Sequence, residues 1–133
     1  MVDTCIRNFV ELRGVLAGAP ALSHESRGER FFTFPVETRR LSGTPDKLNV
    51  VTRESLMATA ELNEASRIHV TGELRSFNNK RGEGAKLIVT VFAREIGFDD
   101  GDDLNLVELI GTLCKPPNLR TTPMGRDICD LML

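Results

Sequence analysis

Apolar and polar side chains alternate along several short segments of the chain, which is the pattern of half-buried β-strands. In residues 6–16, Val10, Leu12 and Leu16 share one face, and Gly14 marks the kind of bend at which a small barrel turns a corner. A loop is expected from about 17 to 28. The later strands are expected around Phe32–Val36, Leu48–Val50, Ile68–Leu74 and Leu87–Ala93.

Residues 53–62 interrupt this alternation. They are rich in helix-forming residues and predict one short helix after the third strand. Three strands, a helix and two more strands follow the order of an OB-fold, a five-stranded Greek-key barrel. An immunoglobulin-like sandwich would need more strands and no helix. The pattern therefore predicts an all-β, five-stranded OB-fold with one short helix.

The chain begins this pattern twice. Residues 8–36 match residues 105–133 without a gap, at a spacing of 97 positions. Nine residues recur, whereas chance would give about two identities over such a stretch. The residues Asn8, Val10, Glu11, Leu12, Gly14, Leu16, Pro20, Leu22 and Gly28 recur as Asn105, Val107, Glu108, Leu109, Gly111, Leu113, Pro117, Leu119 and Gly125. A C-terminal β-hairpin that begins a second OB-fold is expected.

An acidic, glycine-containing segment separates the two copies and is typical of a solvated linker. We predict an OB-fold domain over 1–97, a linker over 98–103, and the first hairpin of a truncated second OB-fold over 104–133. An isolated hairpin is marginal in water. Its unsatisfied apolar face predicts pairing with another chain, and so a homo-oligomer. That face comprises Val107, Leu109, Leu113, Leu131 and Leu133.

Composition narrows the class of protein. A net charge of -2 argues against coating duplex DNA by bulk charge, but it leaves room for a local basic groove. The three cysteines, Cys5, Cys114 and Cys129, and the two histidines, His24 and His69, lack metal-site spacing, so we expect reduced packing cysteines and no metal or other cofactor. Motifs of hydrolases, metalloproteases and nucleotide-binding enzymes are missing from the sequence, and no enzyme activity is expected.

The sequence also lacks an apolar run long enough to span a bilayer, and its start has no signal-peptide pattern. No membrane partner is expected, and a cytoplasmic location follows by default.

The C-terminal extension carries a motif. Residues 105–113 read N-L-V-E-L-I-G-T-L, and residues 117–125 read P-N-L-R-T-T-P-M-G. This resembles the first hairpin of bacterial single-stranded DNA-binding proteins, which has the form N-x-V-x-L-x-G-x-L followed by P-x-x-R-x-T-P-x-G. The resemblance extends more weakly to residues 8–36, where Ser23, Glu25 and Ser26 replace the R-x-T-P part.

Tandem OB-fold proteins form a variant branch of that family, and primosomal OB-fold proteins are relatives of it. The resemblance implies single-stranded DNA as the ligand, oligomerisation through the sheet, and a role in DNA replication, recombination or repair. The chain departs from the family in having no Trp and no Tyr.

Binding a single strand requires cations for the phosphates and aromatic faces for the bases. Phe31 has the phase opposite to Phe32 and Phe34, and Phe77 falls in the loop between the fourth and fifth strands, so both are candidate stacking rings. The loop 75–86 is the strongest candidate because it joins an aromatic ring to four cations. The full predicted set is Arg13, Phe31, Arg39, Arg40, Lys47, Arg53, Arg75, Phe77, Lys80, Arg81, Lys86, Arg94 and Arg120.

Two functions remain open from the sequence. The first is a single-stranded DNA-binding protein that uses a basic OB-fold face and loops. The alternative is an OB-fold protein-interaction or oligomerisation domain of a DNA-processing complex, with little DNA binding of its own. The cationic loop 75–86 favours the first, and the lack of Trp and Tyr favours the second.

Overall fold

The computed structural model describes residues 6–60, 62–63, 65–78 and 87–133. The chain divides into two compact units. The larger unit comprises Phe9–Val107, and the smaller one comprises Glu108–Leu133 together with the described residues up to Asn8. In the described part of the chain, no helix is long and apolar enough to cross a membrane.

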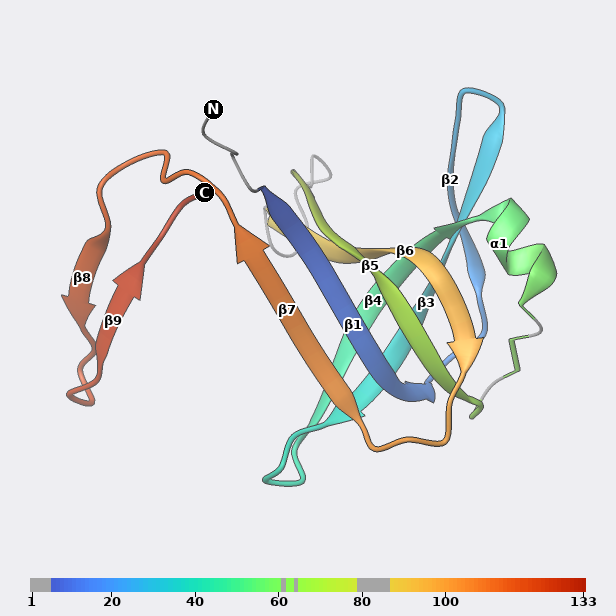
Figure 1. Cartoon of the computed structure of the whole chain (residues 1–133), viewed down its shortest axis with the longest axis horizontal. Helices are drawn as coiled ribbons and strands as arrows, with labels where there is room; N and C mark the ends of the chain where they lie inside the picture. Colours follow the sequence, from blue (N-terminus) through green and yellow to red (C-terminus); the bar gives the residue numbers. More distant parts are fainter. Residues whose placement is uncertain (1–5, 61, 64, 79–86) are drawn as a thin grey trace. The chain divides into compact units, whose positions relative to one another are not determined.

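Five strands of the larger unit close into a barrel (Figure 1). The strands follow the order β1-β3-β4-β6-β5, and β1 meets both β5 and β3, with Leu16 opposite Val36. The β4–β6 pair is parallel, and the other pairs are antiparallel. This is the predicted OB-fold connectivity, with helix α1 between β4 and β5. The elements are β1 (Arg7–Leu16), β3 (Glu29–Arg39), β4 (Pro45–Arg53), α1 (Glu54–Thr59), β5 (Arg67–Asn78) and β6 (Leu87–Phe98).

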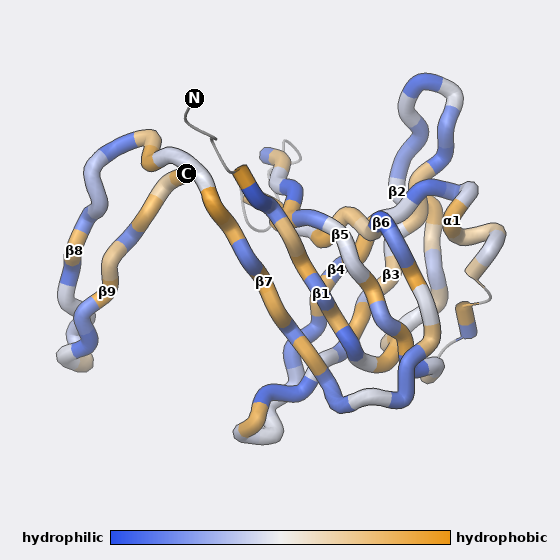
Figure 2. Tube along the Cα trace, viewed as in Figure 1, coloured by the Kyte–Doolittle hydropathy of each residue, from blue (hydrophilic) through white to orange (hydrophobic). Residues whose placement is uncertain are grey.

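The predicted inward residues form the barrel core. Val10, Leu12 and Leu16 are at most 1% exposed, and Phe34 is equally buried, while Phe32 is half-buried. Figure 2 shows the corresponding alternation of hydrophobic and hydrophilic positions along β1. The other core residues are Val36, Val50, Ile68, Val70, Val91 and Ala93.

Gly14 lies where the barrel closes. A Cβ at this position would lie 2.3 Å from the carbonyl oxygen of Glu37, so only glycine allows β3 to approach β1 this closely. The β1–β5 register is continuous across Gly14, which is opposite Ile68. The register shift lies in β5 instead, between Thr71 and Gly72.

The prediction of a loop over 17–28 is wrong in part, because strand β2 (Ala21–Ser26) lies within it and pairs with the start of β3. All six side chains of β2 are exposed, so no apolar alternation reveals the strand. The turn between the strands has positive φ at Arg27 (52°) and Gly28 (77°), the backbone of a tight β-hairpin turn.

The acidic segment after β6 is bound to the barrel, whereas its composition predicted a solvated linker. Arg67 donates to Asp103 at 2.7 Å and to the carbonyl oxygen of Gly101 at 2.6 Å. The backbone N–H of Arg39 also donates to Asp103, at 2.9 Å. Burial raises the pKa of Asp103, but the hydrogen bonds and charges of Arg67 and Arg39 outweigh burial and hold it below its usual value. The domain boundary placed at this segment stays a prediction.

Strand β7 (Leu104–Ile110) is the edge strand next to β1 in the seven-stranded sheet. Strands β8 (Asn118–Thr121) and β9 (Asp127–Asp130) form a separate two-stranded sheet. The predicted C-terminal β-hairpin is therefore present, but its strands are β8 and β9, and residues 104–113 do not supply its first strand as predicted. Strand β5 occupies one edge of β1. On the other edge of β1, only its last two residues pair with β3, so the rest of that edge is open to β7.

The internal repeat is visible in the backbone of the two copies. Ala17 N–H donates to the carbonyl oxygen of Pro35 at 2.9 Å, and 97 positions later Cys114 N–H donates to that of Met132 at 2.7 Å. The positive φ of Gly28 likewise recurs at Gly125. The prediction that the chain begins its fold twice is thus confirmed in local geometry.

The prediction that the cysteines are packing residues is wrong for the two that the structure describes. Cys114 and Cys129 are free thiols, but both are exposed. Cys5 lies outside the described residues.

Candidate nucleic-acid interface

A groove of about 520 Å³ crosses the outer face of five neighbouring strands, β2, β3, β4, β6 and β5. We call it the strand groove. Its residues from β3, β4 and β6 alternate with the inward residues Phe34, Val50 and Val91, so the barrel pattern itself orients them outward. The groove is lined by Ser23, His24, Ser26, Phe31, Thr33, Asn49, Val51, Arg75, Ser76, Phe77, Ile88, Thr90 and Phe92.

Aromatic rings from several strands meet in this groove. The imidazole of His24 on β2 stacks on Phe31 of β3, with ring centroids 4.7 Å apart and an interplanar angle of 8°. Phe31 is also 6.2 Å from Phe92 of β6. Phe77 on β5 is 54% exposed. The groove therefore presents the kind of flat surfaces on which bases stack.

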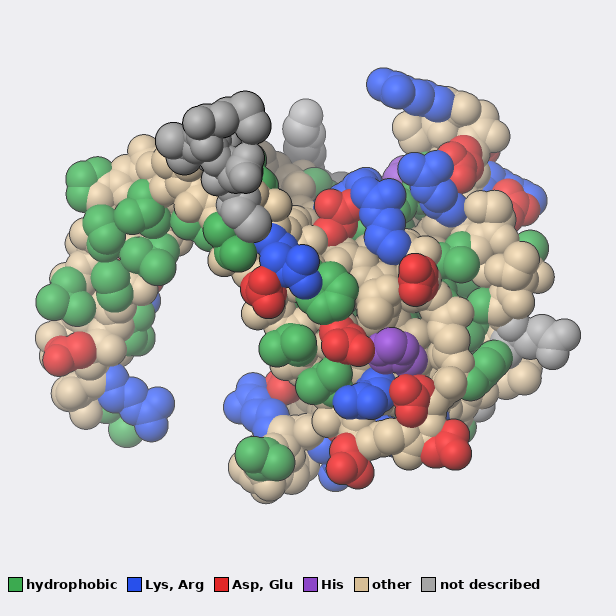
Figure 3. Space-filling model, in the orientation of Figure 1, with side chains coloured by type: hydrophobic (Ala, Val, Ile, Leu, Met, Phe, Trp, Pro, Cys, Tyr) green, Lys and Arg blue, Asp and Glu red, His purple; other side chains and the backbone are tan. Residues whose placement is uncertain are grey.

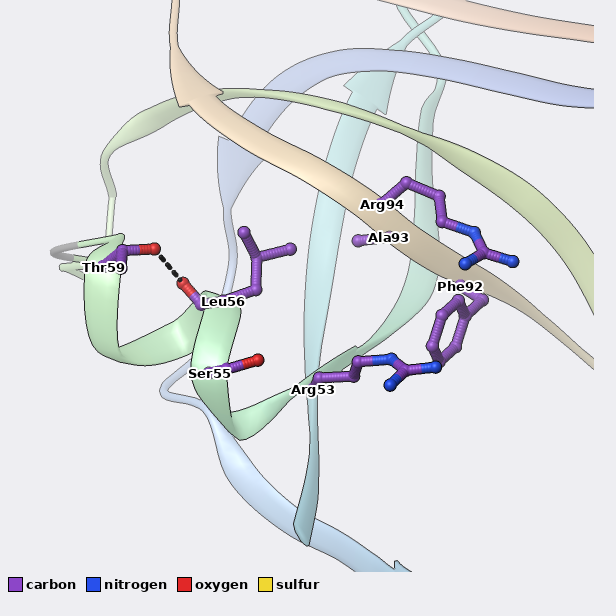
Figure 4. Close-up of a pocket in the computed structure, with 7 residues that line it drawn as sticks. All are labelled: Arg53, Ser55, Leu56, Thr59, Phe92, Ala93 and Arg94. Carbon is purple, nitrogen blue, oxygen red and sulfur yellow. Dashed lines mark hydrogen bonds between the residues drawn. The ribbon is translucent and has the colours of Figure 1, made fainter. Parts of the chain in front are cut away.

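Phe92 lies beneath three arginines. The guanidinium carbon of Arg75 is 3.8 Å from the ring centroid, that of Arg94 is 5.3 Å away, and that of Arg53 is 5.9 Å away. These distances are typical of cation–π contacts. Phe92 is only 3% exposed, although it belongs to the outer face rather than to the barrel core. Figure 4 shows Arg53 and Arg94 approaching this ring from neighbouring strands.

Glu73 on β5 holds two of these arginines. Its carboxylate accepts hydrogen bonds from Arg75 at 3.1 Å and from Arg94. Burial raises the pKa of Glu73, but the hydrogen bonds and charges of Arg94 and Arg75 outweigh burial and place it below its ordinary value. Glu73 therefore carries a negative charge at neutral pH and orients both guanidinium groups.

Five of the residues predicted as contacts come together here: Phe31, Arg53, Arg75, Phe77 and Arg94. Arg75 and Phe77 lie in strand β5, which continues to Asn78, and not in a loop as predicted. Three more predicted residues, Lys80, Arg81 and Lys86, lie outside the described residues.

Other predicted residues lie elsewhere in the barrel. Arg39, Arg40 and Lys47 are at the opposite end of the β3–β4 hairpin from Phe31, about 26 Å along the strands at 3.3 Å per residue. Arg40 forms a bidentate salt bridge there with Asp46, in which each hydrogen bond is 2.8 Å long.

Arg13 lies on the β1–β5 face, opposite His69 and 3.8 Å from Asp99. Arg120 belongs to the smaller unit, where it pairs with Asp130 at 2.8 Å. Both of these predicted cations therefore face acidic partners outside the strand groove. Figure 3 shows that basic and acidic side chains are interspersed over the visible face.

Sequence reasoning missed two of the rings that line the groove, His24 and Phe92. His24 lies on β2, which was predicted as a loop. Phe92 shares the outward phase of Ile88, Thr90 and Arg94, and this phase was the available signal. No group of three or more potential metal ligands occurs among the described residues.

The chain resembles solved structures of known proteins. The N-terminal domain of PriB from Thermoanaerobacter tencongensis, a dimeric structure, is 38% identical, with a TM-score of 0.61. That similarity covers 71% of this chain and 98% of the PriB domain.

Two structures of the single-stranded DNA-binding protein from Thermus aquaticus also match. The wild-type structure is 26% identical with a TM-score of 0.75, and a deletion mutant is 25% identical with a TM-score of 0.71. Both similarities cover 95% of this chain, but they span 66% and 67% of the Thermus chains. No family model and no curated protein matches the chain.

Proposed function

This chain belongs to the family of OB-fold single-stranded DNA-binding proteins, and we propose that it binds one strand of DNA in the strand groove. The supporting observation is that stacking rings and a cation lie together in one groove on the outer face of the sheet. His24, Phe31 and Phe77 offer faces for bases, and Arg75 offers a charge for phosphate. The described lining contains no carboxylate, which suits an anionic ligand although the whole chain is acidic.

We further propose that this binding serves DNA replication, recombination or repair in the cytoplasm, without catalysis. A single strand with unpaired bases is the form of DNA whose base faces are accessible to such rings. The resemblance to a single-stranded DNA-binding protein from Thermus supports the same choice of ligand.

Replacing both Arg75 and Phe77 with alanine is expected to weaken binding of oligo-dT. The loss of one stacking ring alone lowers affinity about 5- to 150-fold, and the loss of one phosphate contact makes binding less sensitive to salt. Fluorescence anisotropy of a labelled oligonucleotide at low and moderate salt measures both effects.

The double variant Arg40→Ala, Leu41→Ala is the matched control. It removes the same kinds of side chain, an arginine and an exposed apolar group, from the β3–β4 turn away from the groove. Its affinity should equal that of the unchanged protein. If the unchanged protein fails to bind oligo-dT at any salt concentration, the chain is an interaction domain instead.

We also propose that the chain self-associates through its smaller unit. Leu109, Leu113, Leu131 and Leu133 there are 44–62% exposed, and a two-stranded sheet such as β8–β9 is marginal by itself. The dimeric state of the related PriB domain supports a second copy as the partner.

Leu131→Asp is accordingly expected to convert an oligomer into a monomer in light scattering. A charge at this position would have to be buried without a partner in the interface. Leu41→Asp is the control, because Leu41 is fully exposed in the barrel unit. A monomer at all concentrations of the unchanged protein would contradict the proposal.

A further inference from the structure

A second pocket of about 300 Å³ shares Phe92 with the strand groove. Figure 4 shows the residues that line this pocket. Strands β4 and β6 supply Arg53 and Arg94, and helix α1 supplies Ser55 and Thr59. Phe92 lines both this pocket and the groove, so the two are neighbours. We call it the arginine pocket.

The sheet register places the two arginines side by side. In the parallel β4–β6 pair, Val51 is opposite Phe92, so Arg53 and Arg94 lie two residues further along their strands at the same level. Like charges on neighbouring strands repel each other. A bound anion would remove this repulsion.

The charges around Phe92 are not balanced. Three guanidinium groups surround the ring, but among the described residues they have two acidic partners: Glu29 pairs with Arg53 at 3.3 Å, and Glu73 is shared by Arg75 and Arg94. Within this part of the chain, one positive charge is therefore in excess. Side chains of Arg53 and Arg94 are 49% and 55% exposed, so an anion from solvent can reach them.

We propose that the arginine pocket holds a backbone phosphate of the strand that lies in the strand groove. This inference rests on the proposed function, since it names where the bound strand continues. Guanidinium groups suit phosphate because their planar donors match its oxygens. The exposed hydroxyl of Ser55 adds a further donor in the pocket. A strand leaving the groove over Phe92 meets these groups next.

The test is Ser55→Asp, which places a carboxylate among the arginines without removing any of them. Ser55 is exposed in the first turn of α1, where an acidic side chain is favourable, so the variant should melt no lower than the unchanged protein. Its affinity for oligo-dT should fall about tenfold or more, as expected for losing a charge-assisted contact. The slope of log affinity against log salt should decrease by about 0.7, the value for one phosphate of a single strand.

Ala58→Asp is the matched control, because Ala58 is exposed on the same helix but does not line the pocket. It gives the same net charge and should retain the affinity and salt slope of the unchanged protein. Equal behaviour of the two variants, with oligo-dT binding still sensitive to the Arg75 and Phe77 changes, would overturn this inference and leave the proposed function intact. No binding by the unchanged protein would instead remove the proposed function.

Inorganic phosphate distinguishes the source of the anion. It should compete with oligo-dT in the unchanged protein and lose this effect in Ser55→Asp. If phosphate raises the melting temperature of the unchanged protein but the two aspartate variants bind oligo-dT equally, the pocket binds free phosphate and the strand does not enter it.

Discussion

Gly72→Ala is expected to destabilise the barrel by about 3 kcal/mol or more, the upper range for forcing extra volume into a packed site. A Cβ at Gly72 would lie 1.9 Å from the carbonyl oxygen of Phe92 and 2.8 Å from its carbonyl carbon. These are backbone atoms, so no side-chain rotation relieves the clash, and β5 must separate locally from β6. Urea unfolding followed by far-ultraviolet circular dichroism measures the loss.

Gly97→Ala is the control for this prediction. Gly97 lies in the partner strand β6, and a Cβ there would have nothing within 4 Å. Its stability should change little. A Gly72→Ala protein as stable as Gly97→Ala would show that the close approach of the two strands is not a requirement of the fold.

The Gly72 change should also disturb the interface. The register shift beside Gly72 sets the pairing that follows, in which Glu73 is opposite Phe92 and Arg75 is opposite Thr90. Glu73 and Arg75 owe their positions over the groove to that shift. Any folded fraction of Gly72→Ala is therefore expected to bind oligo-dT more weakly than the unchanged protein.

Phe34→Ala is expected to cost about 3–5 kcal/mol, because it opens a cavity in the closed barrel. Phe34 is 1% exposed and belongs to the core cluster. A protein of this size has a total stability of about 5–15 kcal/mol, so much of it would be lost. Thermal and urea unfolding of the variant provide the measurement.

Phe31→Ala on the same strand is the informative comparison. Phe31 is half-buried on the outer face, where it stacks on His24. Its removal should cost less stability than that of Phe34 and should weaken oligo-dT binding by about 1–3 kcal/mol. If the two variants lose stability equally and Phe31→Ala binds normally, Phe31 is a packing residue and the groove needs another stacking ring.

The local pattern of apolar and polar side chains was sufficient to predict much of the barrel. The alternation of Val10, Leu12 and Leu16 identified the inward face of β1, and the break in alternation after Arg53 located the helix within a few residues. The nine identities identified the repeat, which recurs in the backbone at Cys114 and Met132. These features depend on side-chain periodicity and backbone turns, which are local properties of a chain.

Some features could not be predicted from the side-chain pattern, because they leave no local signal in the sequence. Strand β2 is exposed on all its residues, so only its pairing with β3 makes it a strand. The partner of β7 also depends on pairing, because apolar alternation predicts a strand but not the edge it joins. The acidic segment after β6 was expected in solvent, and Arg67 and the backbone of Arg39 bind it to the barrel.

By itself, the sequence determined an OB-fold barrel, a second beginning of the same fold, and a set of candidate cations and rings. Only the tertiary structure decided which of them share a surface. Arg53, Arg75 and Arg94 are far apart in the chain, and they meet over Phe92 because β6 lies between β4 and β5 in the sheet. Arg40 and Lys47 belong to the same hairpin as Phe31, yet strand length separates them from the groove. Side-chain phase is a local property, whereas neighbourhood across a sheet depends on strand order and register, which no single segment encodes.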